Sequence, residues 1–215
     1  MFKIDRMDFL VSMYIFCIAV SELMGAKTFP LVSLGSFQLN ASVAIFVVPV
    51  VFSINDVITE VYGQERTRSI IRSGLVVVGL IFLTSLAFTA LPPSSRFASQ
   101  EAAYDKVFGL SARFSFASLT AFALAEFLDV YIFTKIRQAL GKKSLWLRNN
   151  LSNFGSQLID TLVFMVLAFW ALDKPFAQNF NFILSISIPY YLLKCLMSVI
   201  ETPLVYLGVN WLKKN

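Results

Sequence analysis

Six long apolar segments constrain this 215-residue chain more than any other feature. A helix needs about 20 apolar residues, at 1.5 Å each, to cross the hydrocarbon of a bilayer, and it must satisfy its backbone hydrogen bonds internally. We therefore expect an all-α polytopic membrane protein with six transmembrane helices in a single domain, residues 1–215. The expected helices are approximately Phe9–Ala26, Ala41–Tyr62, Ser73–Leu91, Leu110–Thr134, Leu151–Leu172 and Phe182–Val209.

The composition excludes most soluble and catalytic classes. Hydrophobic residues make up 57% of the chain and charged residues only 14%, whereas soluble domains carry about 25% charged residues. The absence of histidine excludes imidazole acid/base catalysis and zincin sites. Cys17 and Cys195 lie inside apolar segments without metal-ligand spacing. We expect no metal, no cofactor and no enzymatic activity.

The basic residues concentrate in alternate connections, which is typical of membrane topology and not of a nucleic-acid-binding surface. Twelve lie in the N-terminus, the second-to-third connection, the fourth-to-fifth connection and the tail: Lys3, Arg6, Arg66, Arg68, Arg72, Lys135, Arg137, Lys142, Lys143, Arg148, Lys213 and Lys214. Five lie in the other connections: Lys27, Arg96, Lys106, Arg113 and Lys174. This asymmetry predicts that both termini are cytoplasmic.

The segments on the expected outer side are less regular. The stretch Thr28–Asn40, with Pro30 and Gly35, predicts an outer loop or a partly embedded turn. The stretch Pro92–Gly109 is long enough for a short interfacial helix. The first apolar segment lacks a clear cleavage site, so we interpret it as a retained helix and not as a signal peptide.

Acidic and amide side chains cluster inside three of the expected helices. A carboxylate in hydrocarbon costs roughly 2.5–3.5 kcal/mol even on the lenient insertion scale, so such groups usually serve function. In the second helix Asp56 and Glu60 share a face that Asn55 borders. The alternative for Glu60 is an ion pair with Arg66 or Arg68 at the cytoplasmic surface.

The fourth and fifth helices carry the other two clusters. Glu126 and Asp129 continue a stripe of serines along the fourth helix, and the alternative for one of them is a salt bridge to a nearby base. The serines themselves could serve only close helix packing. In the fifth helix Asn153, Gln157 and Asp160 follow at helical spacing, with Asp160 close to the midplane.

The sixth helix contains Lys194, the one basic residue placed in the middle of an expected span. A buried lysine needs a carboxylate partner or loses its proton. Asp160, Asp56 or Glu22 could supply that partner, and Glu22 is the weaker site candidate because it lies nearer the outer side. Pairing of a structural kind and contact with a substrate both remain open.

Aromatic residues beside these acids complete the expected site. Phe52, Phe122 and Phe164 lie close to the acids in sequence and could sandwich a flat ring, although most aromatics in such a chain face lipid or pack in the core. Carboxylates accept hydrogen bonds, and amides both accept and donate them. This chemistry favours a planar, donor-rich heterocycle or a cation as the ligand.

Three segments carry a family resemblance. They read SINDVITEVYG (Ser53–Gly63), EFLDVYIFTKIRQ (Glu126–Gln138) and NFGSQLIDTLVF (Asn153–Phe164). The chain resembles the queuosine precursor transporter family, also called the vitamin uptake transporter family, over nearly its whole length. The resemblance implies an importer of 7-cyano- and 7-aminomethyl-7-deazaguanine in the bacterial inner membrane.

The resemblance and the site chemistry together suggest roles for the polar residues. Asp160 or Asp56 would meet the N–H edge of the base, and Gln157 or Asn153 its O6 edge. A second acid, Glu126 or Asp129, would meet an aminomethyl cation or hold a transported proton.

Other classes of membrane protein stay open. The runner-up is the substrate-binding subunit of an energy-coupling-factor vitamin importer, which would need ATPase partners because the chain has no Walker motif. A membrane enzyme or an assembly protein is less favoured. The expected partners are the small molecule and the lipid bilayer but no nucleic acid, and a homodimer is left open.

Overall fold

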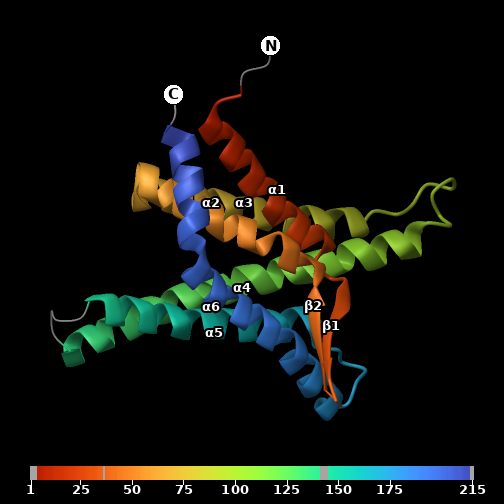
Figure 1. Cartoon of the computed structure of the whole chain (residues 1–215). Helices are drawn as coiled ribbons and strands as arrows, with labels where there is room; N and C mark the ends of the chain where they lie inside the picture. Colours follow the sequence, from red (N-terminus) through yellow and green to blue (C-terminus); the bar gives the residue numbers. More distant parts are fainter. Residues whose placement is uncertain (1–3, 36, 141–144, 214–215) are drawn as a thin grey trace.

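The computed structural model describes residues 4–35, 37–140 and 145–213, and six long helices dominate these ranges (Figure 1). The elements in chain order are α1 (Arg6–Met24), β1 (Thr28–Leu34), β2 (Phe37–Ser42), the 3-10 helix η1 (Val43–Phe46), α2 (Val48–Tyr62), α3 (Gln64–Thr89), α4 (Glu101–Leu140), α5 (Leu145–Phe169) and α6 (Phe176–Lys213). A helix therefore occupies most of each of the six apolar segments that the sequence predicted.

Four helical stretches are long and apolar enough to cross a membrane: Arg6–Met24, Val43–Tyr62, Glu65–Thr89 and Glu101–Ala125. A shorter apolar stretch of helix, Gln157–Phe169, lies within α5. These counts cover the described residues, which leave out several side chains of α5 and α6. The fold is that of a helical membrane protein, and six crossings remain a prediction.

The prediction of an all-α fold was wrong between α1 and α2, where the chain forms a β-hairpin. Strands β1 and β2 pair antiparallel from Thr28 opposite Ser42 to Leu34 opposite Phe37, with an irregularity between Pro30 and Val32. Gly35 at the tip has φ of 61°, a conformation that glycine adopts without steric cost. Short β-branched and aromatic runs around such a turn favour paired strands over a loop.

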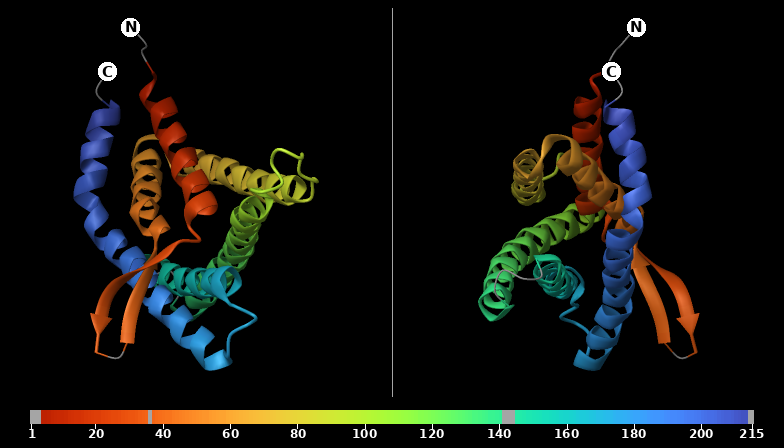
Figure 2. Two further views of the ribbon diagram at one scale, coloured as in Figure 1. Left: turned by 90° about the vertical axis from the view of Figure 1, so that its right-hand side faces the viewer. Right: turned by 60° about the vertical axis from the view of Figure 1, so that its left-hand side comes forward.

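The hairpin lies beside the first half of α6 (Figure 2). The Asn40 amide donates to the Ser185 hydroxyl at 2.8 Å. The Ser42 hydroxyl donates to the carbonyl of Gly25 at 2.5 Å and accepts from the Ala44 backbone N–H. These bonds fix the hairpin to the end of α1 and to α6, and so set where α2 begins.

Two predicted connections are shorter than expected. Gly63 alone separates α2 from α3, with φ of 84°, so α3 begins at Gln64 and not near Ser73. The basic residues assigned to this connection therefore lie on the first turns of α3. Likewise α4 begins at Glu101, so the second half of the region expected to hold a separate interfacial helix belongs to α4 itself.

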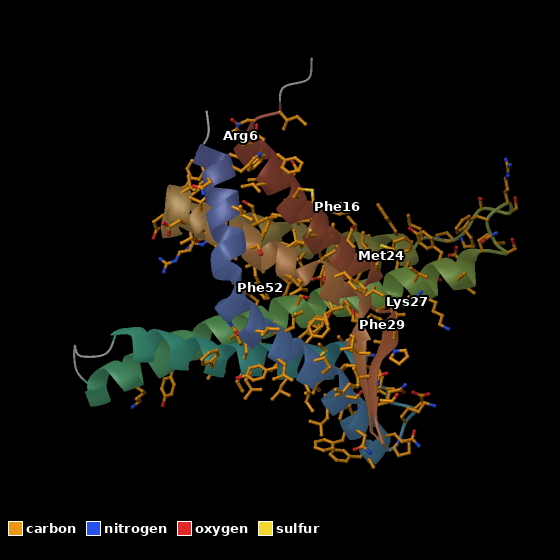
Figure 3. All side chains as sticks on the ribbon, viewed as in Figure 1. Arg6, Phe16, Met24, Lys27, Phe29 and Phe52 are labelled. Atoms are coloured by element: carbon orange, nitrogen blue, oxygen red, sulfur yellow. The ribbon has the colours of Figure 1, made fainter. Side chains whose placement is uncertain are left out.

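The start of α1 and the end of α6 lie side by side (Figures 1 and 2). Arg6, at the start of α1, donates from Nη1 to the carbonyl of Trp211 at 2.7 Å, and its guanidinium carbon lies 5.6 Å from the Trp211 ring centroid. Figure 3 shows Arg6 and Met24 at opposite ends of α1, with Lys27 and Phe29 continuing into the hairpin. Adjacent termini fit an even number of crossings, whereas the side on which they lie stays a prediction.

Arg113, which the sequence placed among the outer bases, lies inside α4 and contacts the end of α5. Its Nε donates to the Leu167 carbonyl at 2.7 Å and its Nη2 to the Trp170 carbonyl at 2.5 Å. The last carbonyls of a helix lack intrahelical partners and carry partial negative charge. Arg113 therefore satisfies the end of α5 and holds α5 against α4.

The predicted orientation can be tested by cysteine labelling. In a variant with Cys17 and Cys195 replaced by Ala, a cysteine at the exposed position Ser95 should react with a membrane-impermeant maleimide in right-side-out vesicles. A cysteine at the exposed position Ile4 should react only after permeabilisation. The reverse pattern would contradict cytoplasmic termini.

Candidate functional site

A cavity of about 310 Å³ lies between the helices and contains charged, amide, hydroxyl and aromatic side chains. Its polar and aromatic lining comprises Tyr14, Ser21, Glu22, Phe52, Asn55, Ser118, Phe122, Asp160, Phe164 and Lys194. A smaller hollow of about 140 Å³ adjoins it and shares Ser21, Val48, Ser118, Asp160, Phe164 and Lys194. Small-molecule pockets usually occupy about 300–1,000 Å³, so the cavity can hold a compact ligand.

The charged pair in the cavity joins α5 to α6. Lys194 Nζ lies 2.6 Å from Asp160 Oδ2, and the side chains are 12% and 31% exposed, respectively. A lysine in apolar surroundings needs such a partner to keep its charge at acceptable cost. Of the three carboxylates that the sequence offered for Lys194, the structure pairs it with Asp160.

Glu22 projects into the cavity from the last turn of α1 and is only 7% exposed. Its Oε1 accepts a hydrogen bond of 2.7 Å from the Ser118 hydroxyl of α4. The Ser115 hydroxyl lies beside the same carboxyl, yet neither Ser115 Oγ nor Glu22 Oε2 has a well-formed hydrogen bond within the described residues. The serine stripe of α4 thus faces an acid as well as packing against α1.

Asn55 brings an amide from α2 to the same cavity. Its side chain lies beside the Tyr14 hydroxyl of α1, and its Oδ1 is buried without a hydrogen-bond partner in the described structure. Tyr14 packs closely on Gly74 of α3, where an added Cβ would come 3.0 Å from the ring. A buried acceptor without a partner is costly, which marks Asn55 as a point where a ligand could bind.

Three phenyl rings complete the lining, contributed by Phe52 of α2, Phe122 of α4 and Phe164 of α5. Phe164 is fixed by an edge-to-face contact with Phe114, with ring centroids 5.6 Å apart. Rings held in this way present flat apolar faces to whatever fills the cavity.

The structure brings together six of the twelve residues proposed from sequence: Asp160, Lys194, Asn55, Phe52, Phe122 and Phe164. Gln157 does not line this cavity, although its Oε1 is buried without a described partner. The side chains of Glu126, Asp129 and Asn153 lie outside the described part of the structure. Any role of these four residues in binding stays a prediction.

Asp56 and Glu60 are exposed and absent from this cavity lining. The face of α2 that lines the cavity carries Val48, Val51, Phe52 and Asn55, which step by three and four. Asp56 follows Asn55 by one residue and is therefore turned about 100° away around the helix. Of the three polar residues predicted on α2, Asn55 lines this cavity, and a role of Asp56 and Glu60 in binding stays a prediction.

The residues of the cavity that sequence reasoning undervalued are Glu22, Ser118 and Tyr14. Glu22 was set aside because it lies near the outer end of its segment. A signal was available, since the serine stripe of the fourth helix had no assigned partner and Glu22 lies within an apolar segment.

The cavity lining can form directional hydrogen bonds with a ligand, but its described side chains do not form a metal site. Within the described residues, no three histidine, cysteine, aspartate or glutamate side chains come together as metal ligands. Instead, an ion pair, a carboxyl and an amide surround a space bordered by phenyl rings. Such a lining can hydrogen-bond the edges of a flat polar ring and stack against its faces.

Comparison with known proteins agrees with this architecture. Residues 42–208 match the family described as "Putative vitamin uptake transporter". The chain belongs to this family. It is therefore a transporter, embedded in the membrane by several helices, and not an enzyme.

Curated relatives are similar over most of the chain. A "Probable queuosine precursor transporter" of Bacillus subtilis is 31% identical over 79% of this chain and 72% of its own length. The "Queuosine precursor transporter" of Escherichia coli is 28% identical over 72% of this chain and 66% of its own. A "Probable queuosine precursor transporter" of Haemophilus influenzae is 28% identical over 76% and 69%, respectively. No solved structure matches the chain significantly.

The ion pair makes a testable contribution to stability. Asp160→Asn or Lys194→Gln alone should destabilise the protein by about 1–3 kcal/mol, because each leaves a partly buried charge without its partner. The double variant should be less destabilised than either single variant, because no charge is then left unpaired. Thermal unfolding in detergent measures this, with exposed Lys174→Gln as the matched control. Equal destabilisation by Lys174→Gln and Lys194→Gln would contradict the assignment.

Proposed function

We propose that this protein imports queuosine precursors, 7-cyano- and 7-aminomethyl-7-deazaguanine, across the bacterial inner membrane as a secondary transporter. The names of its relatives support this substrate class. The observation that carries the proposal is the cavity, where the Asp160–Lys194 pair shares one space with the unpartnered oxygen of Asn55. That combination supplies acceptors, donors and aromatic faces together.

The chemistry of a 7-deazaguanine fits these groups. The base presents N1–H and an exocyclic amine as neighbouring donors, which a carboxylate such as Asp160 can accept as two parallel hydrogen bonds. Its O6 lies next to N1 and can accept from Lys194, which is held 2.6 Å from the same carboxylate. One edge of the base would thus contact both members of the pair.

The remaining groups would bind the rest of the base. The Asn55 amide can donate or accept and would take a ring nitrogen or its proton. Phe52, Phe122 and Phe164 would contact the two faces of the ring, a geometry worth about 0.5–1.5 kcal/mol per aromatic pair beyond buried area. We further propose that Gln157 or Asn153 contacts O6 in another conformation of the transporter. In that conformation Glu126 or Asp129 would contact the aminomethyl cation.

The alternative, a binding subunit of an energy-coupling-factor importer, makes a different prediction. Such a subunit needs partner ATPases, whereas a secondary transporter works alone. Uptake of labelled 7-cyano-7-deazaguanine by liposomes containing only this chain, with guanine as competitor, would support the proposal. Absence of uptake by the purified chain, together with uptake by cells that express it, would favour the alternative. Dimer formation does not decide between the two.

Within that assay, Asp160→Asn should lower uptake at least about tenfold, since an amide replaces a charged acceptor that faces two donors and charged hydrogen bonds contribute about 1.5–3 kcal/mol. Asp173→Asn, an acid-to-amide change at an exposed position between α5 and α6, should transport normally. Membrane insertion of both variants is checked by detergent extraction and gel filtration. Normal uptake by a well-inserted Asp160→Asn variant would remove Asp160 from the binding site.

A further inference from the structure

Glu22 has no counter-charge in the described cavity. Lys194, the one cation in the described lining, lies 2.6 Å from Asp160 and is already paired. The nearest base on the α4 segment that faces Glu22, Arg113, binds the carbonyls at the end of α5. The other titratable groups of the described lining are Asp160 and Tyr14, and neither can supply a positive charge.

An ionised carboxylate in this position would be expensive. Glu22 is 7% exposed and has one firm hydrogen bond, from Ser118. A buried charge without an opposite charge is strongly unfavourable, and such groups usually become neutral instead. The neutral acid can donate from Oε2 to the adjacent Ser115 hydroxyl while Oε1 still accepts from Ser118, so one proton satisfies both unpartnered oxygens.

We propose that the Glu22 carboxyl is the site that binds the transported proton, so that one proton crosses the membrane with each substrate molecule. This inference rests on the proposed function, because it takes the cavity as the substrate site. The substrate contacts Asp160, Lys194 and Asn55, and the proton binds separately on Glu22 at another part of the same cavity.

The position of Glu22 suits this role. It lies in the last turn of α1, at the opposite end of that helix from Arg6 and the chain termini. With cytoplasmic termini, as the sequence predicts, Glu22 lies towards the outer side, where an importer takes up its proton. The cavity can close around Glu22 at low cost only when the carboxyl is neutral, so closure is linked to proton binding. The proton then leaves with the substrate when the cavity opens inward.

The test replaces Glu22 by a residue that mimics the protonated acid permanently. Wild type and Glu22→Gln are reconstituted in liposomes with the membrane potential clamped, and labelled 7-cyano-7-deazaguanine is followed with and without a pH gradient. With the lumen one pH unit more alkaline, a transporter that moves one proton per neutral substrate should accumulate it about tenfold. Glu22→Gln should still exchange substrate measurably but show no accumulation driven by the pH gradient.

The matched control is Glu65→Gln, which removes an exposed carboxylate on α3 that pairs with Arg68. This control should accumulate substrate like wild type. Glu22→Asp keeps a titratable carboxyl and should retain gradient-driven accumulation, which separates loss of the proton site from loss of the fold.

The outcomes separate the two proposals. If wild type transports substrate without regard to the pH gradient, or if Glu22→Gln still accumulates it, the proton site is wrong and the substrate assignment stands. If wild type neither exchanges nor accumulates the precursor, the proposed function itself is wrong.

A second measurement does not require transport. At a pH alkaline enough to ionise Glu22 in the substrate-free protein, adding substrate to wild type in weakly buffered detergent solution should cause proton uptake, because the closed, substrate-bound cavity favours the neutral acid. Glu22→Gln should lose this uptake. Equal proton uptake by both proteins would overturn the assignment even if the variant had lost exchange.

Discussion

The ion pair between Lys194 and Asp160 is the interaction on which the organisation of the cavity depends. It joins α5 to α6 at 2.6 Å, with the Lys194 and Asp160 side chains 12% and 31% exposed. Leaving either partly buried charge without its partner is unfavourable, so each fixes the position of the other. Because the two helices are tied at this point, the Phe164 ring of α5 faces the same space as the polar groups of α1 and α2.

Much of the helical layout could be predicted from the sequence, because spanning a bilayer leaves a chain few alternatives. The predicted helix boundaries were wrong where a local feature of the chain mattered more than hydropathy. The charged residues after Gly63 had suggested a connecting loop, but Gly63, with its positive φ, makes the whole turn and α3 begins at the next residue. The hairpin was missed because its short strands become stable only through contacts with α6 and the end of α1, such as that between Asn40 and Ser185.

The lining of the candidate cavity could be predicted only in part. Polar residues inside apolar segments pointed to Asp160, Lys194 and Asn55, which the structure places on this cavity, because burying a polar group in hydrocarbon costs free energy on any face of a helix. Sequence spacing shows which residues share a face but not which face turns inward, and Asp56 was therefore weighted over Asn55. Glu22 was undervalued for a related reason: its importance depends on α4 placing Ser118 beside it, a contact across 96 positions of sequence.

We propose that one cavity, to whose lining all six helices α1 to α6 contribute, holds the substrate, and ligand protection tests this most directly. Single cysteines at Ser21 and Val51 line the cavity from different helices without removing a proposed substrate contact, and one at Ser95 lies on the exposed loop after α3. In protein lacking the native cysteines, 7-cyano-7-deazaguanine should slow maleimide alkylation at the first two positions and leave the third unchanged. Alkylation at Ser21 and Val51 that is equally fast with and without saturating substrate would contradict the account.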